Sequence, residues 1–227
     1  MDGRTAIFDL DGTLVDTSRD MIAAANACFA AMGAAPPLDP VTDAATAFAG
    51  GRAMLRLGFA RLEQGGAAEV ETWYPRFLDI YAEGIDRDSR PYPGAVAAVG
   101  RLRAAGWRVG ICTNKPERLA VLLLERLGIS GAFGALVGAD TLPVRKPDPA
   151  PFLETVRRLG GDRGRSFLLG DTVTDRDTAR AAGVPVALVT FGPEGRGIAR
   201  LAPDALLDAY ADLDALAEAL TGPQPTR

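Results

Sequence analysis

Residues 8–16 read FDLDGTLVD. Here an apolar run ends in two aspartates, Asp9 and Asp11, which are separated by one residue and followed directly by a glycine. The apolar run from Thr5 to Asp9 predicts a short buried strand. Because α/β folds bind ligands beyond the carboxyl ends of their parallel strands, Asp9 and Asp11 are expected at a ligand-binding edge. A bare Asp-x-Asp pair is equally consistent with an acidic turn, so the rest of the sequence has to decide.

A second acidic segment follows another apolar run. Asp171 comes directly after residues 166–170, and Asp175 stands four residues later. If the two strands are neighbours, Asp9, Asp11 and Asp171 converge, and unit charges about 4 Å apart repel by about 4 kcal/mol at an effective dielectric near 20. Such a cluster needs a cation. The alternative is that Asp171 only caps the helix that begins near Asp175.

Composition restricts the kind of cation. The 227 residues include no His and two Cys, so nitrogen-ligated and thiolate metal sites have almost no ligands. Carboxylate and carbonyl oxygens suit a hard ion, and Mg²⁺ also accepts a phosphate oxygen from a substrate. Without His, carboxylates must carry the proton transfers.

Two further segments can bind an anion. Thr113 and Asn114 end the strand predicted at 107–113, ahead of a helix, where a hydroxyl and an amide can donate hydrogen bonds, although such residues are more often a simple cap. Lys146 precedes Pro147 and can place a point charge against a phosphoryl oxygen, although a Lys-Pro turn is more often a solvated loop.

The pattern along the chain predicts an α/β fold with a doubly wound parallel sheet and an inserted helical segment. From Gly94 onward, short apolar runs alternate with amphipathic helical stretches. Strands are expected at 5–9, 107–113, 135–138, 166–170, 185–189 and 205–207. Residues 17–88 show helical spacing and no strand, with helices expected at 39–48, 51–63 and 67–84. The predicted domains are a core of residues 1–16 and 89–227 and a helical cap of residues 17–88.

In order and spacing, the four segments that contain Asp9, Thr113, Lys146 and Asp171 resemble the motifs of the haloacid dehalogenase superfamily. Within that superfamily they resemble the phosphoglycolate phosphatases with a helical C1 cap. The resemblance implies a Rossmann-like core with the cap inserted after the first strand. It also implies a Mg²⁺-dependent phosphatase that acts through an aspartyl phosphate on a small phosphorylated metabolite. The expected substrate is 2-phosphoglycolate.

The same resemblance implies a role for each acidic residue of the first motif. Asp9 is expected to be the nucleophile and Asp11 the general acid and base. Asp9, the main-chain carbonyl of Asp11 and Asp171 are expected to hold Mg²⁺.

For the remaining motif residues, the resemblance implies contacts to the phosphoryl group. Thr113 and Asn114 would bind it, and Lys146 would offset its charge. Asp175 would support the metal shell or orient Lys146.

Gly50, Gly51 and Arg52 resemble the substrate loop of the cap in phosphoglycolate phosphatases. Glycines allow a close backbone approach, and a guanidinium can hold a carboxylate with two hydrogen bonds, which suits glycolate as the leaving group. The alternative is that the two glycines only separate two helices and that Arg52 is solvated.

Several other activities of the superfamily remain to be weighed. Dehalogenation is disfavoured because a halide needs no proton, whereas Asp11 is present. Schiff-base cleavage of phosphonates is disfavoured because residues 17–88 contain no Lys. A sugar-phosphate mutase similar to β-phosphoglucomutase, a pyrophosphatase and a broad sugar-phosphate phosphatase stay open as alternatives, as does a scaffold without catalysis.

Charge and hydropathy indicate the setting of the protein. A net charge of −4 and a pI near 5.0 predict no binding to nucleic acid or to an anionic membrane surface. No apolar run approaches the length of a membrane span, and no signal sequence is recognised, so a cytoplasmic location is expected. The protein is expected to be a monomer or a homodimer.

Overall fold

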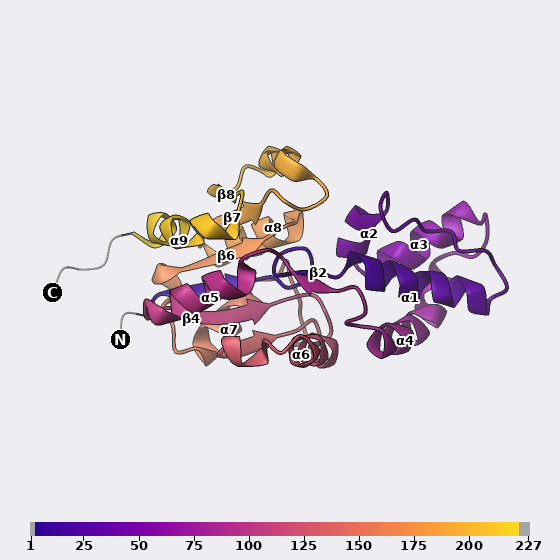
Figure 1. Ribbon diagram of the computed structural model, residues 1–227, viewed down its shortest axis with the longest axis horizontal. Helices are drawn as coiled ribbons and strands as arrows, with labels where there is room; N and C mark the ends of the chain where they lie inside the picture. The colour runs from indigo at the N-terminus through magenta and orange to yellow at the C-terminus, as the bar shows by residue number, and fades with distance from the viewer. Residues whose placement is uncertain (1–2, 223–227) are drawn as a thin grey trace. The chain divides into compact units, whose positions relative to one another are not determined.

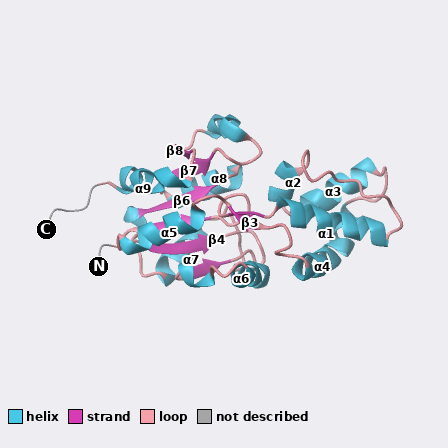
Figure 2. Ribbon diagram, viewed as in Figure 1, coloured by secondary structure: helices cyan, strands magenta, loops and turns pink. Residues whose placement is uncertain are grey.

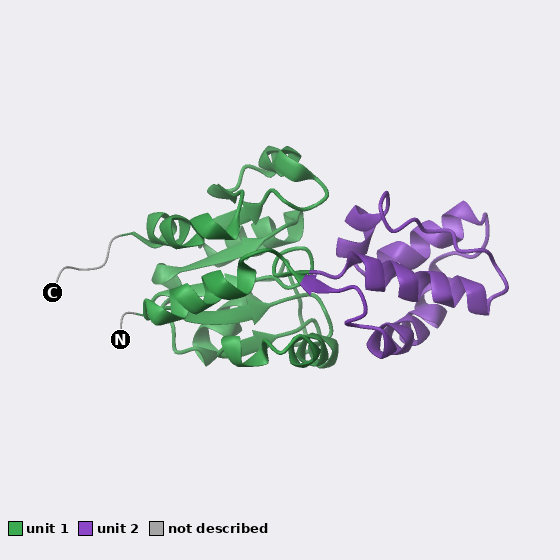
Figure 3. Cartoon of the chain, in the orientation of Figure 1, with its two compact units in different colours: residues 1–15, 91–227 green, residues 16–90 purple. Residues whose placement is uncertain are grey.

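The computed structural model describes residues 3–222 and contains two compact units (Figure 3). Unit 1 comprises residues 1–15 and 91–227, and unit 2 comprises residues 16–90. The chain passes between the units twice, at β2 (Val15–Asp16) and β3 (Arg90–Pro91), which form a two-stranded sheet. That residues 17–88 act as a cap stays a prediction.

Unit 1 is built on a six-stranded parallel sheet with the order β5-β4-β1-β6-β7-β8 (Figure 1). The strands are β1 (Thr5–Phe8), β4 (Arg108–Cys112), β5 (Ala135–Val137), β6 (Ser166–Gly170), β7 (Val186–Val189) and β8 (Ala205–Leu207). The strand order steps outward from β1 in both directions, so the predicted doubly wound α/β fold is confirmed.

Helices cover both faces of this sheet (Figure 2). They are α5 (Ala95–Ala104), α6 (Glu117–Arg126), α7 (Ala150–Arg158), α8 (Val173–Ala182) and α9 (Leu213–Thr221), with short 3₁₀ turns η1 (Ser130–Ala132), η2 (Arg163–Arg165), η3 (Gly195–Leu201) and η4 (Tyr210–Asp212). Helices α5 and α9 contact each other over β4, β6 and β8, whereas α7 and α8 contact each other over the opposite face. Within residues 3–222, no helix is both long enough and apolar enough to cross a membrane.

The strand register brings the predicted functional segments to one edge. Phe8, the last residue of β1, pairs with Ile111 of β4 and with Leu169 of β6, so the three strands end within one residue of the same level. The Asp9 N–H donates to the Leu169 carbonyl at 2.8 Å, which extends this pairing by one residue. All four residues of β1 are buried, as the apolar run predicts.

Unit 2 consists of α1 (Ser18–Ala31), α2 (Ala44–Phe48), α3 (Gly51–Arg61) and α4 (Ala67–Glu83), and α1 contacts the other three helices. Phe29 of α1 meets Phe59 of α3 edge to face, with ring centroids 5.2 Å apart. The buried Asp20 accepts hydrogen bonds from the N–H and the hydroxyl of Ser89 at 2.8 and 2.7 Å. These contacts tie the first helix of unit 2 to the segment in which the chain returns.

The helix predicted at 39–48 is wrong over its first half, because α2 begins only at Ala44. One carboxylate oxygen of Asp39 accepts hydrogen bonds from the N–H groups of Val41 and Thr42, both at 2.8 Å. This side-chain turn offers those N–H groups an alternative to helical partners, and the helix starts after it.

Candidate active site

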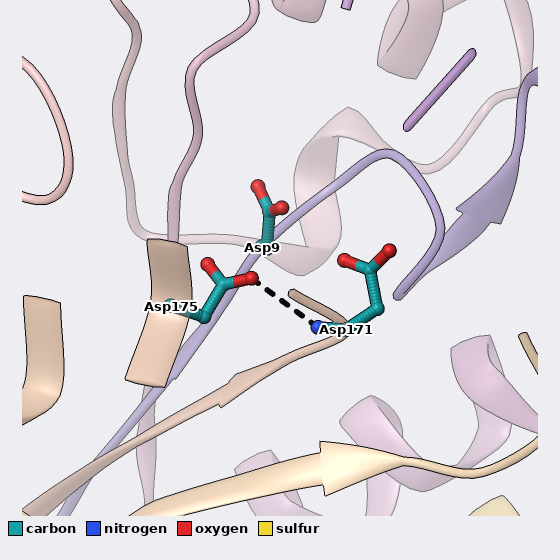
Figure 4. A group of neighbouring side chains, drawn as sticks. All are labelled: Asp9, Asp171 and Asp175. Carbon is teal, nitrogen blue, oxygen red and sulfur yellow. Dashed lines mark hydrogen bonds between the residues drawn. The ribbon is translucent and has the colours of Figure 1, made fainter. Parts of the chain in front are cut away.

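Three carboxylates meet beyond the carboxyl ends of β1 and β6 (Figure 4). Asp9 follows β1, Asp171 follows β6, and Asp175 lies in the first turn of α8. One oxygen from each lies within 4.8 Å of the others. The prediction depended on β1 and β6 being neighbours, and they are.

Asp175 is held on all sides by hydrogen bonds. Its Oδ2 accepts from the Thr172 N–H and hydroxyl at 3.1 and 2.8 Å and from the Asp171 N–H at 3.3 Å, the dashed line of Figure 4. Its Oδ1 accepts from Lys146 Nζ at 2.7 Å. A Cβ at Gly170 would lie 2.3 Å from the Asp175 side chain, so only glycine fits at the end of β6. Thr172, and not Asp171, therefore caps α8, and Asp175 fixes the position of Lys146.

Burial and like charges control the electrostatics of the cluster. Lys146 Nζ lies 3.0 Å from Asp9 Oδ1. Burial raises the pKa of Asp9 to about 6, with Asp175 and Asp11 adding to the rise and Lys146 opposing it. Burial also raises the pKa of Asp171 well above its usual value, helped by Asp175 and Asp9. Burial favours a lower pKa for Lys146, but the carboxylates of Asp175 and Asp9 raise it above the usual range.

The residues fit a hard divalent cation. Asp9 Oδ1 is buried and, apart from its ion pair with Lys146, accepts no hydrogen bond, and Asp171 accepts one from the Thr13 hydroxyl at 3.0 Å. Because Asp175 is already saturated by four donors, Asp9 and Asp171 are the carboxylates with capacity for an ion. Oxygen donors with excess negative charge are what Mg²⁺ prefers.

The carboxylate of Asp11 lies outside this cluster of three and contacts a residue that the sequence analysis did not assign. Lys115 Nζ donates to Asp11 Oδ1 at 2.8 Å, and the Lys115 side chain is only 3% exposed. The signal available in the sequence was scarcity, because the chain has only two Lys and one directly follows Thr113 and Asn114.

Thr113 and Asn114 lie at the same edge and organise the loops around it. Thr113 is buried, and its hydroxyl accepts from the Lys115 N–H at 3.2 Å. The Asn114 amide donates to the main-chain oxygen of Lys146 at 3.0 Å and so links the two loops that carry the lysines. Phosphoryl binding by Thr113 and Asn114 stays a prediction.

The predicted cap loop has contacts of its own within unit 2. A Cβ at Gly51 would lie 2.3 Å from the Phe77 ring, so packing requires glycine there. The Arg52 guanidinium donates to both oxygens of Glu71 at 2.7 and 2.9 Å and lies 3.5 Å above the Tyr74 ring. A contact between Gly50, Gly51 or Arg52 and a substrate stays a prediction.

A tyrosine far along the chain also supports the site. The Tyr210 hydroxyl donates to the Thr13 carbonyl at 2.7 Å, and the Thr13 hydroxyl donates to Asp171. The ring centroids of Tyr210 and Phe191 are 5.5 Å apart, and those of Phe191 and Tyr92 are 4.7 Å apart. Tyr210 is buried, and nothing in the sequence around it indicates this hydrogen bond.

Comparisons with known proteins agree with this geometry. The sequence model of the haloacid dehalogenase-like hydrolases matches residues 4–183. The phosphoglycolate phosphatase of Mesorhizobium japonicum is 40% identical over 205 residues, which is 90% of each chain. The phosphoglycolate phosphatase of Agrobacterium fabrum is 42% identical over 210 residues, 92% of this chain and 89% of the relative.

A solved structure described as a predicted phosphoglycolate phosphatase from Haemophilus somnus superposes with a TM-score of 0.81 at 25% identity, over 95% of this chain and 98% of the other. The family match spans the strands and loops that carry Asp9, Lys146 and Asp171. The resemblance inferred from the motifs is thus confirmed, and the chain belongs to the haloacid dehalogenase-like hydrolase family.

Proposed function

We propose that this protein is a Mg²⁺-dependent phosphatase that hydrolyses a small phosphate monoester through a phosphorylated Asp9, with 2-phosphoglycolate as its preferred substrate. The observation that carries the proposal is the environment of Asp9, a buried carboxylate whose Oδ1 is ion-paired with Lys146 at 3.0 Å and accepts no hydrogen bond besides. The names of the relatives support the choice of substrate.

In the first step, a carboxylate oxygen of Asp9 attacks phosphorus in line with the ester oxygen. The bond from phosphorus to the ester oxygen breaks, its electron pair goes to that oxygen, and Asp11 supplies the proton. Lys146 is held by Asp175 and offsets the charge on the phosphoryl oxygens and on Asp9.

In the second step, Asp11 takes a proton from water, and the resulting hydroxide attacks the aspartyl phosphate. The bond from phosphorus to Asp9 breaks, which restores the Asp9 carboxylate and releases inorganic phosphate. The net reaction consumes one ester and one water and returns both carboxyl groups to their starting states.

Asp9, Asp171 and the main-chain carbonyl of Asp11 would hold Mg²⁺. When bound, the ion supplies charge neutralisation for the carboxylates and the phosphoryl oxygens. The remaining carboxylate, Asp175, serves as support because its oxygens are already occupied by donors from the protein.

Phosphate release tests the proposal. The panel contains 2-phosphoglycolate, pyrophosphate and β-glucose 1-phosphate, each with Mg²⁺ and with EDTA. We expect a preference for 2-phosphoglycolate that disappears in EDTA and returns with excess Mg²⁺. Asp11→Ala is expected to lose about 10²–10⁴-fold in kcat. Production of glucose 6-phosphate without phosphate release would instead indicate a mutase.

As part of the proposal, unit 2 acts as a cap whose loop of Gly50, Gly51 and Arg52 contacts the leaving group. Because the Arg52 guanidinium is paired with Glu71, this contact requires the pair to open. Arg52→Ala is expected to raise KM for 2-phosphoglycolate more than for p-nitrophenyl phosphate. Equal changes for both substrates would remove the loop from the binding site.

A further inference from the structure

Lys115 is built rigidly into the edge of unit 1. Its N–H donates to the Thr113 hydroxyl, and its carbonyl accepts from the Ala139 N–H at 2.9 Å, so the backbone is fixed on both sides. Its side chain is 3% exposed, and its ammonium lies 2.8 Å from Asp11 Oδ1. Burying an ammonium in a fixed position costs free energy unless it has anionic partners. We therefore ask what function its position beside Asp11 serves.

Charge neutralisation at the nucleophile does not provide that role. Lys146 already lies between Asp9 and Asp175, at 3.0 and 2.7 Å. Lys115 instead contacts Asp11, the residue that protonates the leaving oxygen in the proposed reaction. The two lysines of the chain thus contact different members of the first motif, Lys146 the proposed nucleophile Asp9 and Lys115 the proposed general acid Asp11.

The chemistry of the leaving group connects Lys115 to the substrate. A general acid must come within about 2.6–3.2 Å of the oxygen that it protonates. In 2-phosphoglycolate a single methylene separates that oxygen from the carboxylate, so the carboxylate lies close to any group that contacts Asp11. An ammonium has three N–H donors and can contact Asp11 and a substrate oxygen together.

We propose that Lys115 is a specificity-determining residue that binds the carboxylate of the leaving group and selects alkyl phosphates whose carboxylate is attached to the carbon next to the ester oxygen. This inference rests on the proposed function and deepens it. It places recognition of the carboxylate in unit 1, on the loop after β4, and gives the acidic leaving group a cation that is already in position. Arg52 and Lys115 each have an acidic partner, Glu71 and Asp11, but only Lys115 adjoins the proposed general acid.

The test compares two substrates that differ only at the recognised group. Values of kcat/KM are measured for 2-phosphoglycolate and for ethyl phosphate, in which a methyl group replaces the carboxylate. The variants are Lys115→Met, which removes the charge, and Lys115→Arg, which keeps it. Arg118→Met is the matched control, because it removes a positive charge from an exposed position three residues away.

We expect Lys115→Met to lower kcat/KM for 2-phosphoglycolate about 10–100-fold more than for ethyl phosphate, mainly through KM, as for the loss of a charge-assisted hydrogen bond. Lys115→Arg should recover part of the preference, and Arg118→Met should leave it unchanged. Equal losses for both substrates would overturn the inference, because Lys115 would then act only by positioning Asp11.

Two further measurements keep the outcome interpretable. Thermal melting identifies a variant that does not fold, and Lys115→Gln, which is also neutral, then replaces Lys115→Met under the same criteria. The wild-type protein tests the proposed function separately. If it shows no preference for 2-phosphoglycolate over ethyl phosphate, the proposed substrate fails, whereas a wild-type preference that survives in Lys115→Met refutes only the role of Lys115.

Discussion

Each unit of this protein buries aspartates, but the two units treat them in opposite ways. In unit 2, Asp43 is buried and accepts hydrogen bonds from the Arg61 guanidinium and from the Asp39 N–H. In unit 1, Asp9 is buried among other carboxylates, and its Oδ1 has only the ion pair with Lys146 and no further hydrogen bond. Burial of an acid is therefore no sign of function by itself.

The direction of the pKa shift separates the two cases. Hydrogen bonds from Arg61 lower the pKa of Asp43 below its usual value, whereas burial raises the pKa of Asp9 to about 6 despite the nearby Lys146. A lowered pKa marks a carboxylate whose charge the fold stabilises. The raised pKa of Asp9 reflects a charge that the fold stabilises only in part, which is the state expected of a carboxylate that binds a ligand.

The largest expected effect is the loss of activity when Asp9 is replaced. Asp9→Asn should reduce turnover on the order of 10⁴-fold or more, because the nucleophile is lost, while the protein folds normally. Phosphate release and thermal melting measure the two properties. Asp177→Asn, at a half-exposed position on α8, is the matched control. An active Asp9→Asn variant would refute the mechanism.

The reciprocal change should affect stability and leave catalysis intact. Asp43→Asn is expected to cost about 1.5–3 kcal/mol in the free energy of unfolding, because it removes charged hydrogen bonds to a buried group. Urea unfolding measures the loss, and Asp79→Asn, on the exposed face of α4, is the control. Unchanged stability would mean that Asp43 contributes as little as an exposed acid.

The stability of the metal-free protein should also depend on pH in opposite ways for the two acids. The pKa of Asp9 is raised from a usual value of 3.8 to about 6 in the folded protein. Between pH 3.8 and about pH 6, the folded state therefore keeps a proton on Asp9 that the unfolded state has lost. The contribution of Asp9 to stability therefore falls as pH rises, by about 1 kcal/mol from pH 5 to pH 7. The contribution of Asp43 is fully present above its usual pKa and is lost only as pH falls below that value.

Unfolding in EDTA at a series of pH values checks this expectation. Asp9→Asn should reduce the slope between pH 5 and pH 7, and the part that remains should come from Asp171, whose pKa burial also raises. Excess Mg²⁺ should also reduce the slope. A slope that persists unchanged in Asp9→Asn would assign it to another group.

The smallest expected effect concerns the support of the site. Tyr210→Phe removes the hydrogen bond to the Thr13 carbonyl and should cost about 0.5–1 kcal/mol in the free energy of unfolding. Because Thr13 also donates to Asp171, we expect weaker Mg²⁺ binding, measured by calorimetry. Unaltered Mg²⁺ binding would show that Asp171 is held independently of Tyr210.

The sequence predicted the elements that depend on local pattern. The apolar runs at 5–9, 107–113 and 166–170 each correspond to a strand that differs by at most one residue at either end. The meeting of Asp9 and Asp171 followed as soon as their strands were taken as neighbours, because parallel strands end at one edge.

What the sequence did not predict depends on side-chain contacts between distant segments. The pairing of Lys115 with Asp11 and the hydrogen bond from Tyr210 to Thr13 join residues that no periodicity relates. The late start of α2 depends on a turn closed by the Asp39 side chain, which competes locally with the helix.

The pairing of β2 with β3 has a consequence for how such a protein can change over time. The chain leaves unit 1 and returns to it at the adjacent strands β2 and β3. In the topology of the six-stranded sheet, residues 17–89 are therefore a single insertion between β1 and β4 whose two ends lie side by side. A loop whose ends stay together can be shortened, extended or exchanged without shifting the register of β1 against β4 and β6. The helical unit could therefore be exchanged for another inserted domain during evolution, while unit 1 keeps the same reacting groups.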